Sequence, residues 1–382
     1  MKAGISIIAI LILIFSISTE NGSTPFRQIE LQRLSLEEEN QITQYFYDDQ
    51  IHQIDSFLQH ANKYYRFNGN VLIAHNDEVI FSNSYGYKDF PKKNLHDKNS
   101  VFQLASVSKQ FTAISILMLV EQGKVDLESD IRNYIPEIPY ENITIKNLLQ
   151  HTGGLPNYMW MLEHHWKKER IPTNKDLLKL IKKLNLNRYF RPGRKHDYSN
   201  TGYVLLASIV ESVSGKNFGD FVDENIFSPL GMDNSFIYSA GINKNYPEKI
   251  DGYFRKWGRM RKWDQTLHDG IVGDKGVYST TCDLHLWNQA LYNNKLISDT
   301  LLHEALTKGK IRNRWEFAYG YGFRLKKYRH KEQVYHKGLW QGFRTSFSRF
   351  VDNQLTVIVL NNTDCPGIHS ITDRVERMAN DL

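Results

Sequence analysis

The segments of this chain that look like β-strands lie toward its two ends. Residues 71–74 and 79–81 are two apolar, strand-like runs joined by polar turn residues, which predicts a hairpin. Three further strand-like runs follow in the last part of the chain, at residues 334–336, 345–350 and 355–360. Strands from such distant segments share one core only if the fold brings both parts of the chain together.

Between these runs the sequence pattern is mainly helical. A buried helix is expected before Gly123, a longer helical region covers residues 144–231, and residues 368–380 form a last helix. A sheet and a set of helices in separate stretches of the chain are typical of layered folds. We therefore predict an α+β fold, in which an antiparallel sheet is flanked by helices and carries an inserted all-helical subdomain at about 144–231.

The first residues have the layout of a signal peptide. Lys2 supplies a positive charge, residues 4–17 are almost wholly apolar, and the small residues Ser16 and Ser18 are suited to precede a cleavage point. The apolar run is shorter than a comfortable membrane span. We expect a signal peptide at residues 1–18, and an uncleaved membrane anchor is the alternative.

The rest of the chain is expected to form an N-terminal extension at residues 19–50 and one domain at 51–382. With 382 residues, of which 41% are hydrophobic and 24% charged, the chain is long enough for a large core and unlike a disordered protein. Export predicts a periplasmic or extracellular location, with no stable membrane span after signal cleavage. An N-terminally anchored form is the alternative.

Charge and cysteine content constrain the partners only weakly. The net charge of +6 is small for this length and does not by itself indicate nucleic acid. Cys282 and Cys365 could pair in an oxidising compartment, but Cys282 stands at an expected helix start, so we expect two free thiols. Residues 163–165 lack the spacing that places two histidines on one helical face, so we expect no zinc site.

Ser106 and Lys109 form the only Ser-x-x-Lys motif of the chain, at the start of its most apolar predicted helix. A three-residue spacing on a helix puts both side chains on one face. A serine hydroxyl is a weak nucleophile that needs a base or a strong local field. A lysine in a partly dry cleft can accept the serine proton, because burial disfavours the ammonium form.

Two further motifs follow in a fixed order. Tyr198 and Asn200 belong to a Tyr-Ser-Asn segment on a loop that enters a helix, where side chains project into a cleft. His336 and Lys337 are expected on opposite faces of a strand, and Gly338 beside them would let a substrate approach the backbone. Together with the Ser-x-x-Lys motif, these segments predict a site that works through an acyl-enzyme.

The three motifs resemble those of the β-lactamase-related serine hydrolases, a family that includes class C β-lactamases, penicillin-binding proteins, D-aminopeptidases and related esterases. Residues 148–156 and 273–284 resemble two further signatures of this family. The resemblance covers residues 67 to 360 and implies a β-lactamase/transpeptidase-like fold. It is specific for the family and says little about the substrate.

The resemblance also implies roles for the residues of the site. Ser106 would be the acylated nucleophile, Lys109 its base or a cation that sets the local field, and Tyr198 the group that moves the proton. The residues expected to bind the substrate are Asn200, His336, Gly338 and Leu339. The N–H groups of Ser106 and Leu339 would form the oxyanion hole.

The expected activity is hydrolysis of an amide or ester, without a metal or organic cofactor. The expected substrate is a peptide containing a D-amino acid, such as a peptidoglycan fragment, and a small ester is the second candidate. A penicillin-binding or sensor protein without turnover is the alternative. Because β-lactamases have a lysine at the position of His336, we do not expect efficient β-lactam hydrolysis. Activity on a carboxylate-bearing substrate should then change near pH 6.5, about the ordinary pKa of histidine.

Residues 251–263 interleave basic and aromatic side chains. Such a pattern could bind a glycan or a nucleic acid. A solvated loop whose long cationic side chains cover apolar surface is the interpretation we favour. Since an exported protein does not meet nucleic acid, no nucleic-acid partner is expected.

Overall fold

The computed structural model describes residues 11–14, 30–33, 36–242, 244–312 and 314–382. The chain divides into two compact units, residues 1–56 with Leu382 and residues 57–381. The first unit contains the antiparallel pair β1 (Leu11–Ile14) and β2 (Glu30–Arg33) and most of helix α1 (Leu36–Tyr65). Apart from residues 11–14, the predicted signal peptide lies outside the described residues, as do residues 19–29 and 34–35 of the predicted extension.

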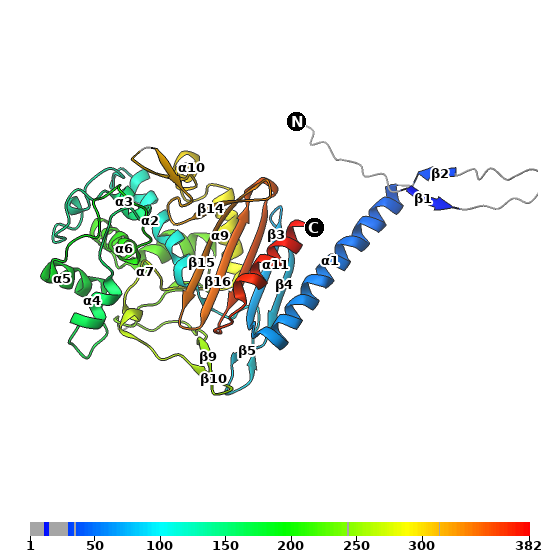
Figure 1. The fold of residues 1–382 in the computed structure, drawn as a ribbon, viewed down its shortest axis with the longest axis horizontal. Coiled ribbons are helices and arrows are strands. Elements are labelled where there is room, and N and C mark those ends of the chain that lie inside the picture. The colour runs from blue at the N-terminus through cyan, green and yellow to red at the C-terminus, as the bar shows by residue number, and fades with distance from the viewer. Residues whose placement is uncertain (1–10, 15–29, 34–35, 243, 313) are drawn as a thin grey trace, which may run out of the picture. The chain divides into compact units, whose positions relative to one another are not determined.

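The second unit is built on a six-stranded antiparallel sheet (Figure 1). Its strands, in spatial order, are β14 (Arg324–Tyr328), β15 (Lys331–Trp340), β16 (Phe343–Phe350), β17 (Leu355–Asn361), β3 (Gly69–His75) and β4 (Glu78–Tyr85). Strand β3 pairs with β17, so that Gly69 lies opposite Asn361 and His75 opposite Leu355. The predicted hairpin and the predicted joining of distant strand segments are both confirmed.

Helices cover both faces of this sheet. Helix α11 (Ile368–Asn380) lies on one face, where its Asp373 forms an ion pair with Lys337 of β15 at 3.2 Å. Helix α9 (Thr281–Tyr292) packs on β3 and β17 from the other face (Figure 1). Helix α2 (Lys109–Glu121) is buried along nearly its whole length. The α+β architecture predicted from the sequence is confirmed.

Residues 144–231 contain a group of helices, and side-chain caps fix the starts of all of these except the last. They are α3 (Ile145–Leu149), α4 (Tyr158–His165), α5 (Asn174–Leu184), α6 (Asn200–Ser214), α7 (Phe218–Val222) and α8 (Ser228–Leu230). Helix α6 packs on α2, α3, α5 and α7 and is therefore the centre of this layer. The Ser199 side chain caps its first turn by accepting a hydrogen bond from the Gly202 N–H.

Smaller sheets and one more helix complete the second unit. They are the three-stranded sheet of β7 (Phe102–Gln103), β11 (Val277–Ser279) and β8 (Phe236–Ile237), the pairs β5 (Tyr87–Asp89) with β6 (Asn94–Leu95), β9 (Tyr253–Lys256) with β10 (Arg259–Lys262) and β12 (Gly309–Ile311) with β13 (Trp315–Phe317), and helix α10 (Asp299–Ala305). The basic and aromatic segment expected to be a loop is therefore a β-hairpin. Its register pairs carbonyl and N–H groups of residues 253–256 and 259–262.

Both cysteines are free thiols, as expected. Cys365 is buried, whereas Cys282 is exposed in the first turn of α9. Among the described residues, no helix combines the length and the hydropathy that crossing a bilayer requires.

Candidate active site

Ser106 lies in a 3₁₀ turn, Ala105–Ser108, that leads directly into α2. The serine side chain is partly exposed, whereas its neighbours Ala105 and Val107 are buried. Ala105 has a φ of 50°, in the left-handed region that residues with a Cβ seldom adopt. Strain of this kind persists only where the surroundings impose the conformation, and it is common in active sites. The turn therefore presents Ser106 from an otherwise buried segment.

Lys109 is fully buried and contacts the nucleophile directly. Its Nζ donates a hydrogen bond to Ser106 Oγ at 3.3 Å and a shorter one, at 2.7 Å, to the backbone carbonyl of Asp274. The ammonium group also lies over the Tyr198 ring, 5.1 Å from its centroid. The three-residue spacing of the motif thus produces the predicted contact between Ser106 and Lys109.

Tyr198 and Asn200 flank the N-cap of α6 and contribute two polar atoms without partners. The Tyr198 hydroxyl and the Asn200 side-chain oxygen are both buried, and neither has a hydrogen-bond partner among the described residues. Most buried polar groups in folded proteins are hydrogen-bonded, and each exception calls for an explanation. Here a bound substrate would supply the missing donors and acceptors.

His151, within the segment 148–156, holds the backbone around Tyr198. The His151 carbonyl accepts a hydrogen bond from the Asp197 N–H at 2.9 Å, and its Nδ1 accepts one from the Ser199 N–H at 3.1 Å. These two bonds fix the backbone on both sides of Tyr198. The His151 ring also lies 4.2 Å from the Tyr198 ring. His151 is therefore a positioning residue for the tyrosine.

His336 is enclosed by the protein, and its predicted role in binding the substrate stays a prediction. Its side chain is fully buried, with Nδ1 donating to the Lys337 carbonyl at 2.9 Å and Nε2 3.2 Å from the Tyr319 hydroxyl. Because Nδ1 carries the proton, Nε2 accepts from Tyr319. Burial, assisted by the positive charges of Lys109 and Arg324, holds the pKa of His336 well below its ordinary value. A pKa held below the ordinary value argues against the change of activity expected near pH 6.5.

At Gly338 the protein leaves no room for a side chain, and the predicted approach of a substrate to this residue stays a prediction. A Cβ at this position would lie 2.2 Å from the Leu104 carbonyl oxygen and 3.0 Å from the Ala105 Cβ. Strand β15 therefore packs directly against the backbone that precedes Ser106. The next residue, Leu339, has a side chain that is 61% exposed, at the edge where the serine opens to solvent. Its predicted role in an oxyanion hole stays a prediction.

A buried network behind Lys109 was not predicted from the sequence. The Asp274 carboxylate accepts a hydrogen bond from the Tyr158 hydroxyl at 3.0 Å and forms an ion pair with Lys275 at 3.5 Å. Lys275 Nζ in turn donates to the Tyr158 hydroxyl at 2.7 Å. Burial lowers the pKa of Lys275 and raises that of Tyr158. This network fixes the Asp274 carbonyl that holds Lys109.

The sequence signal for this network is weak. In the sequence, residues 273–276 stand out only as part of the segment that resembles a family signature. The atom that holds Lys109 is a backbone carbonyl, which every residue has, so the sequence does not mark it. Thr112 Oγ1 donates to the Gly273 carbonyl at 2.7 Å, and the Val277 N–H donates to Ser108 Oγ at 3.1 Å. The segment is therefore bound to the serine turn and to α2 at several points.

The site is rich in positive charge. The Arg324 guanidinium lies 5.2 Å from the centroid of the Tyr198 ring and has no carboxylate partner within ion-pair distance in the part of the chain that the structure describes. Lys109 is likewise held by a carbonyl and a hydroxyl. The resulting field favours a substrate with a negative group, or the negative charge that develops on a carbonyl oxygen under attack.

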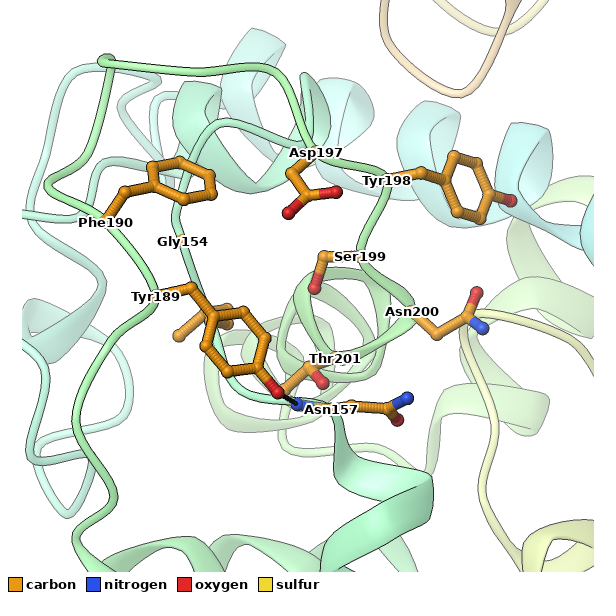
Figure 2. Close-up of a pocket in the computed structure, with 10 residues that line it drawn as sticks. Gly154, Asn157, Tyr189, Phe190, Asp197, Tyr198, Ser199, Asn200 and Thr201 are labelled. Carbon is orange, nitrogen blue, oxygen red and sulfur yellow. Dashed lines mark hydrogen bonds between the residues drawn. The ribbon is translucent and has the colours of Figure 1, made fainter.

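A cavity of about 200 Å³ lies beside Tyr198 but does not contain the nucleophile. Figure 2 shows Asp197 and Ser199 on the cavity side of the chain, and Tyr198 and Asn200 pointing away from it. The Tyr198 ring contacts Lys109 on that other side. The cavity therefore lies behind the Tyr-Ser-Asn segment as seen from Ser106.

An antiparallel sheet flanked by helices, with a lysine bonded to the serine of a Ser-x-x-Lys motif and a tyrosine beside that lysine, is the arrangement of the Ser-x-x-Lys hydrolases. The chain belongs to the Beta-lactamase family, whose model matches residues 54–377. It is 34% identical to penicillin-binding protein 4* of Bacillus subtilis over 81% of this chain and 71% of that protein. It is 28% identical to the teichoic acid D-alanine hydrolase of Staphylococcus aureus over 73% of this chain and 66% of that protein.

A solved structure supports the same assignment. The penicillin-binding protein from Bacillus halodurans superposes with a TM-score of 0.73 at 27% identity, over 86% of this chain and 98% of that one. The family and the fold predicted from the sequence are thereby confirmed. The roles assigned to Ser106, Lys109 and Tyr198 stay predictions.

Proposed function

We propose that the protein is an exported serine hydrolase that forms an acyl-enzyme at Ser106 with an amide or ester of a D-amino acid. The observation that supports this most is the 3.3 Å contact between Lys109 Nζ and Ser106 Oγ, beside the unpartnered Tyr198 hydroxyl. Nucleophile, cation and proton carrier are the parts that acyl transfer through serine requires. No metal or organic cofactor takes part in the proposed reaction.

In the proposed reaction, Ser106 Oγ attacks the carbonyl carbon while its proton passes to Tyr198, which reacts as the phenolate and becomes the phenol. Lys109 lies over the tyrosine ring and donates to the serine oxygen, so its positive charge stabilises the negative charge on either oxygen. Tyr198 then gives the proton to the departing amine or alcohol. Water cleaves the acyl-serine ester in a second step and regenerates Ser106.

The D-amino acid in this proposal is supported by the relatives. One of them is named a teichoic acid D-alanine hydrolase and another a penicillin-binding protein, and both cover more than two thirds of this chain. Peptides containing D-amino acids, such as peptidoglycan fragments, are the first candidate substrates, and D-alanyl esters are the second. A penicillin-binding protein without turnover is the remaining alternative.

The test is intact-protein mass after exposure to benzylpenicillin, together with hydrolysis of D-alanine p-nitroanilide and a D-alanyl ester. We expect an adduct and turnover in the wild type, and neither in Ser106→Ala. Ser108→Ala is the matched control, because its hydroxyl lies in the same turn but bonds to Val277. Labelling that survives in Ser106→Ala would overturn the assignment, and an adduct without turnover of either substrate would favour the non-hydrolysing alternative.

Export is proposed from the sequence of the first 18 residues. The mass of the mature N-terminus, purified from the native host, tests it. A cleaved chain that starts near residue 19 supports a signal peptide, whereas a chain that keeps its first residues supports the anchor.

A further inference from the structure

The β9–β10 hairpin is the most strongly basic and aromatic surface feature of the second unit that the site does not use. Residues 253–263 contain five basic residues, four aromatic residues and no acidic residue. Trp257 at its tip is 84% exposed, and Trp263 at its base is 42% exposed. The hairpin therefore exposes large apolar rings to water, next to basic side chains that water solvates well.

The strand register concentrates positive charge on one face of the hairpin. Lys256 lies opposite Arg259, and Arg261 lies opposite Phe254, so these side chains share a face. Like charges directly opposite each other in a sheet destabilise it. Lys262, on the other face, has Asp251 as a partner at 2.8 Å. In the described part of the chain, no carboxylate within ion-pair distance compensates Lys256, Arg259 or Arg261.

The turn of the hairpin also contains a residue that is unfavourable for the stability of the protein. Trp257 and Gly258 have φ values of 49° and 77°, the two positive angles of a tight hairpin turn that favours Asn, Asp or Gly. A bulky residue is unfavourable in this conformation. Among the residues that the structure describes, only Lys256 Nζ, 4.6 Å from the ring centroid, is found over the Trp257 ring, and the residue is 84% exposed. Folding therefore gives no reason for tryptophan at this position, whereas a partner outside the protein would.

A second hairpin extends the same surface. The Phe90 ring, between β5 and β6, packs edge-on against the Tyr253 ring of β9 with 4.8 Å between centroids, and the two hairpins lie at the same end of the molecule (Figure 1). Leu95 of β6 is 65% exposed, and Lys93 is exposed in the turn before it. Apolar and basic side chains thus occur on both hairpins.

We propose that the β9–β10 hairpin binds the surface of an anionic lipid bilayer. Trp257 enters the headgroup region, where tryptophan is favoured, and Lys256, Arg259 and Arg261 contact anionic headgroups. The anionic headgroups neutralise the like-charged pair, and the interface covers the exposed ring. A soluble linear polyanion fits less well, because a polymer lying along the charged face leaves the tryptophan at the tip in water. This inference does not depend on the proposed hydrolase activity.

The experiment uses the full chain and vesicles of phosphatidylcholine with or without phosphatidylglycerol, carrying brominated acyl chains that quench tryptophan fluorescence. Residues 1–56 contain no tryptophan, so an N-terminal segment that enters the bilayer contributes no signal of its own. We expect quenching of the wild type by the anionic vesicles. In Trp257→Asn the fluorescence with brominated vesicles should equal that with vesicles that lack brominated lipid. Asparagine suits the conformation of the turn but does not insert into the bilayer.

Two controls locate the effect. Trp315→Asn removes another exposed tryptophan, on β13, and should keep the quenching of the wild type. Lys256→Gln combined with Arg259→Gln should weaken binding to anionic vesicles by about 30-fold, because each basic side chain contributes about fivefold to the affinity. Binding to neutral vesicles should not change. Equal melting temperatures would show that the variants are folded.

The proposal is overturned if the wild type shows no quenching, or if Trp257→Asn is quenched like the wild type. It is also overturned if the hairpin charges are needed for binding soluble polyphosphate while anionic vesicles do not compete. That outcome would assign the surface to a polymer.

Discussion

Two single atoms in the site, the Tyr198 hydroxyl oxygen and the Asn200 side-chain oxygen, are buried without a hydrogen-bond partner among the described residues. An unsatisfied buried polar group costs about 1–3 kcal/mol. Nearby Tyr319 illustrates the usual arrangement, since its hydroxyl donates to His336. Atoms that lack such a bond at the nucleophile are those expected to bind or to carry protons.

We therefore expect the Tyr198 hydroxyl to contribute to activity and not to stability. In Tyr198→Phe we expect turnover of a D-alanyl substrate to fall by about 10²–10⁴, the usual contribution of a proton-transferring group. The free energy of unfolding should not fall, because no internal hydrogen bond is lost, and it should rise by up to about 1–3 kcal/mol, the cost of the unsatisfied hydroxyl. Steady-state kinetics and urea unfolding measure the two effects.

Tyr319→Phe is the matched control. It removes a hydroxyl that is bonded to His336, so we expect a loss of about 1 kcal/mol in unfolding free energy and a smaller effect on turnover. If Tyr198→Phe were the less stable variant and kept its activity, Tyr198 would be a structural residue.

For single residues, the sequence predicted which side chains contact each other better than it predicted how deeply each side chain is buried. Helical spacing is enough to bring Lys109 to Ser106, because three residues correspond to about one turn. Strand alternation correctly separated His336 from Lys337, but alternation gives a face and not the distance from solvent. His336 is enclosed by Tyr319 and the backbone, and neither contact has a signature in the local sequence.

At the scale of elements, strand β15 supports the turn that carries the nucleophile. Thr345 of the neighbouring strand donates to the Leu104 carbonyl at 2.8 Å, and Gly338 leaves room for the same carbonyl. The position of Ser106 thus depends on a strand more than two hundred residues further along the chain. The glycine of the third motif acts through this contact.

Gly338→Ala is expected to displace the serine turn. The new Cβ would meet the Leu104 oxygen at 2.2 Å, and because a backbone atom cannot rotate away, the strand or the turn must shift. A displacement of about 1 Å at a catalytic group can lower the rate by about 100-fold. Gly367→Ala is the control, since its Cβ would meet nothing within 4 Å, and it should keep the wild-type rate. Normal kinetics in Gly338→Ala would contradict this account.

The elements themselves were predictable where local chemistry determines them. Capping residues such as Ser199 and turn residues such as Gly123 mark helix ends in the sequence. Residues 251–263, which include this hairpin, were expected to form a solvated loop whose long cationic side chains cover apolar surface. The alternation in this segment contains charges on both faces and resembles no half-buried strand. Its strands are held by each other and by the Trp263 N–H bond to the Gly252 carbonyl.

On the scale of the whole molecule, buried histidines couple stability to pH. Burial lowers the pKa of His96 to about 4 and holds those of His151 and His336 well below the ordinary value. The unfolded chain binds protons at these side chains below about pH 6.5, whereas the folded protein does not. Stability should therefore be constant above that pH and fall as the pH decreases toward 4.

Urea unfolding at pH 7 and pH 5 measures this effect. We expect a lower free energy of unfolding at pH 5, and a smaller difference between the two pH values in His96→Gln. His330→Gln is the control, because this histidine is exposed and should not alter the difference. A protein equally stable at both pH values would contradict the assignment of neutral, buried imidazoles.

The pairing of β3 with β17 has a consequence for the time at which the site forms. A ribosome completes β3 early, but the strand that hydrogen-bonds to it, and β15 that holds the serine turn, are among the last parts to be made. Until then Ser106 is present in the growing chain without the strand that positions it. If Ser106 is the nucleophile, as proposed, a chain interrupted before its last strands contains it without the strand that holds the serine turn, and we expect such a chain to be inactive.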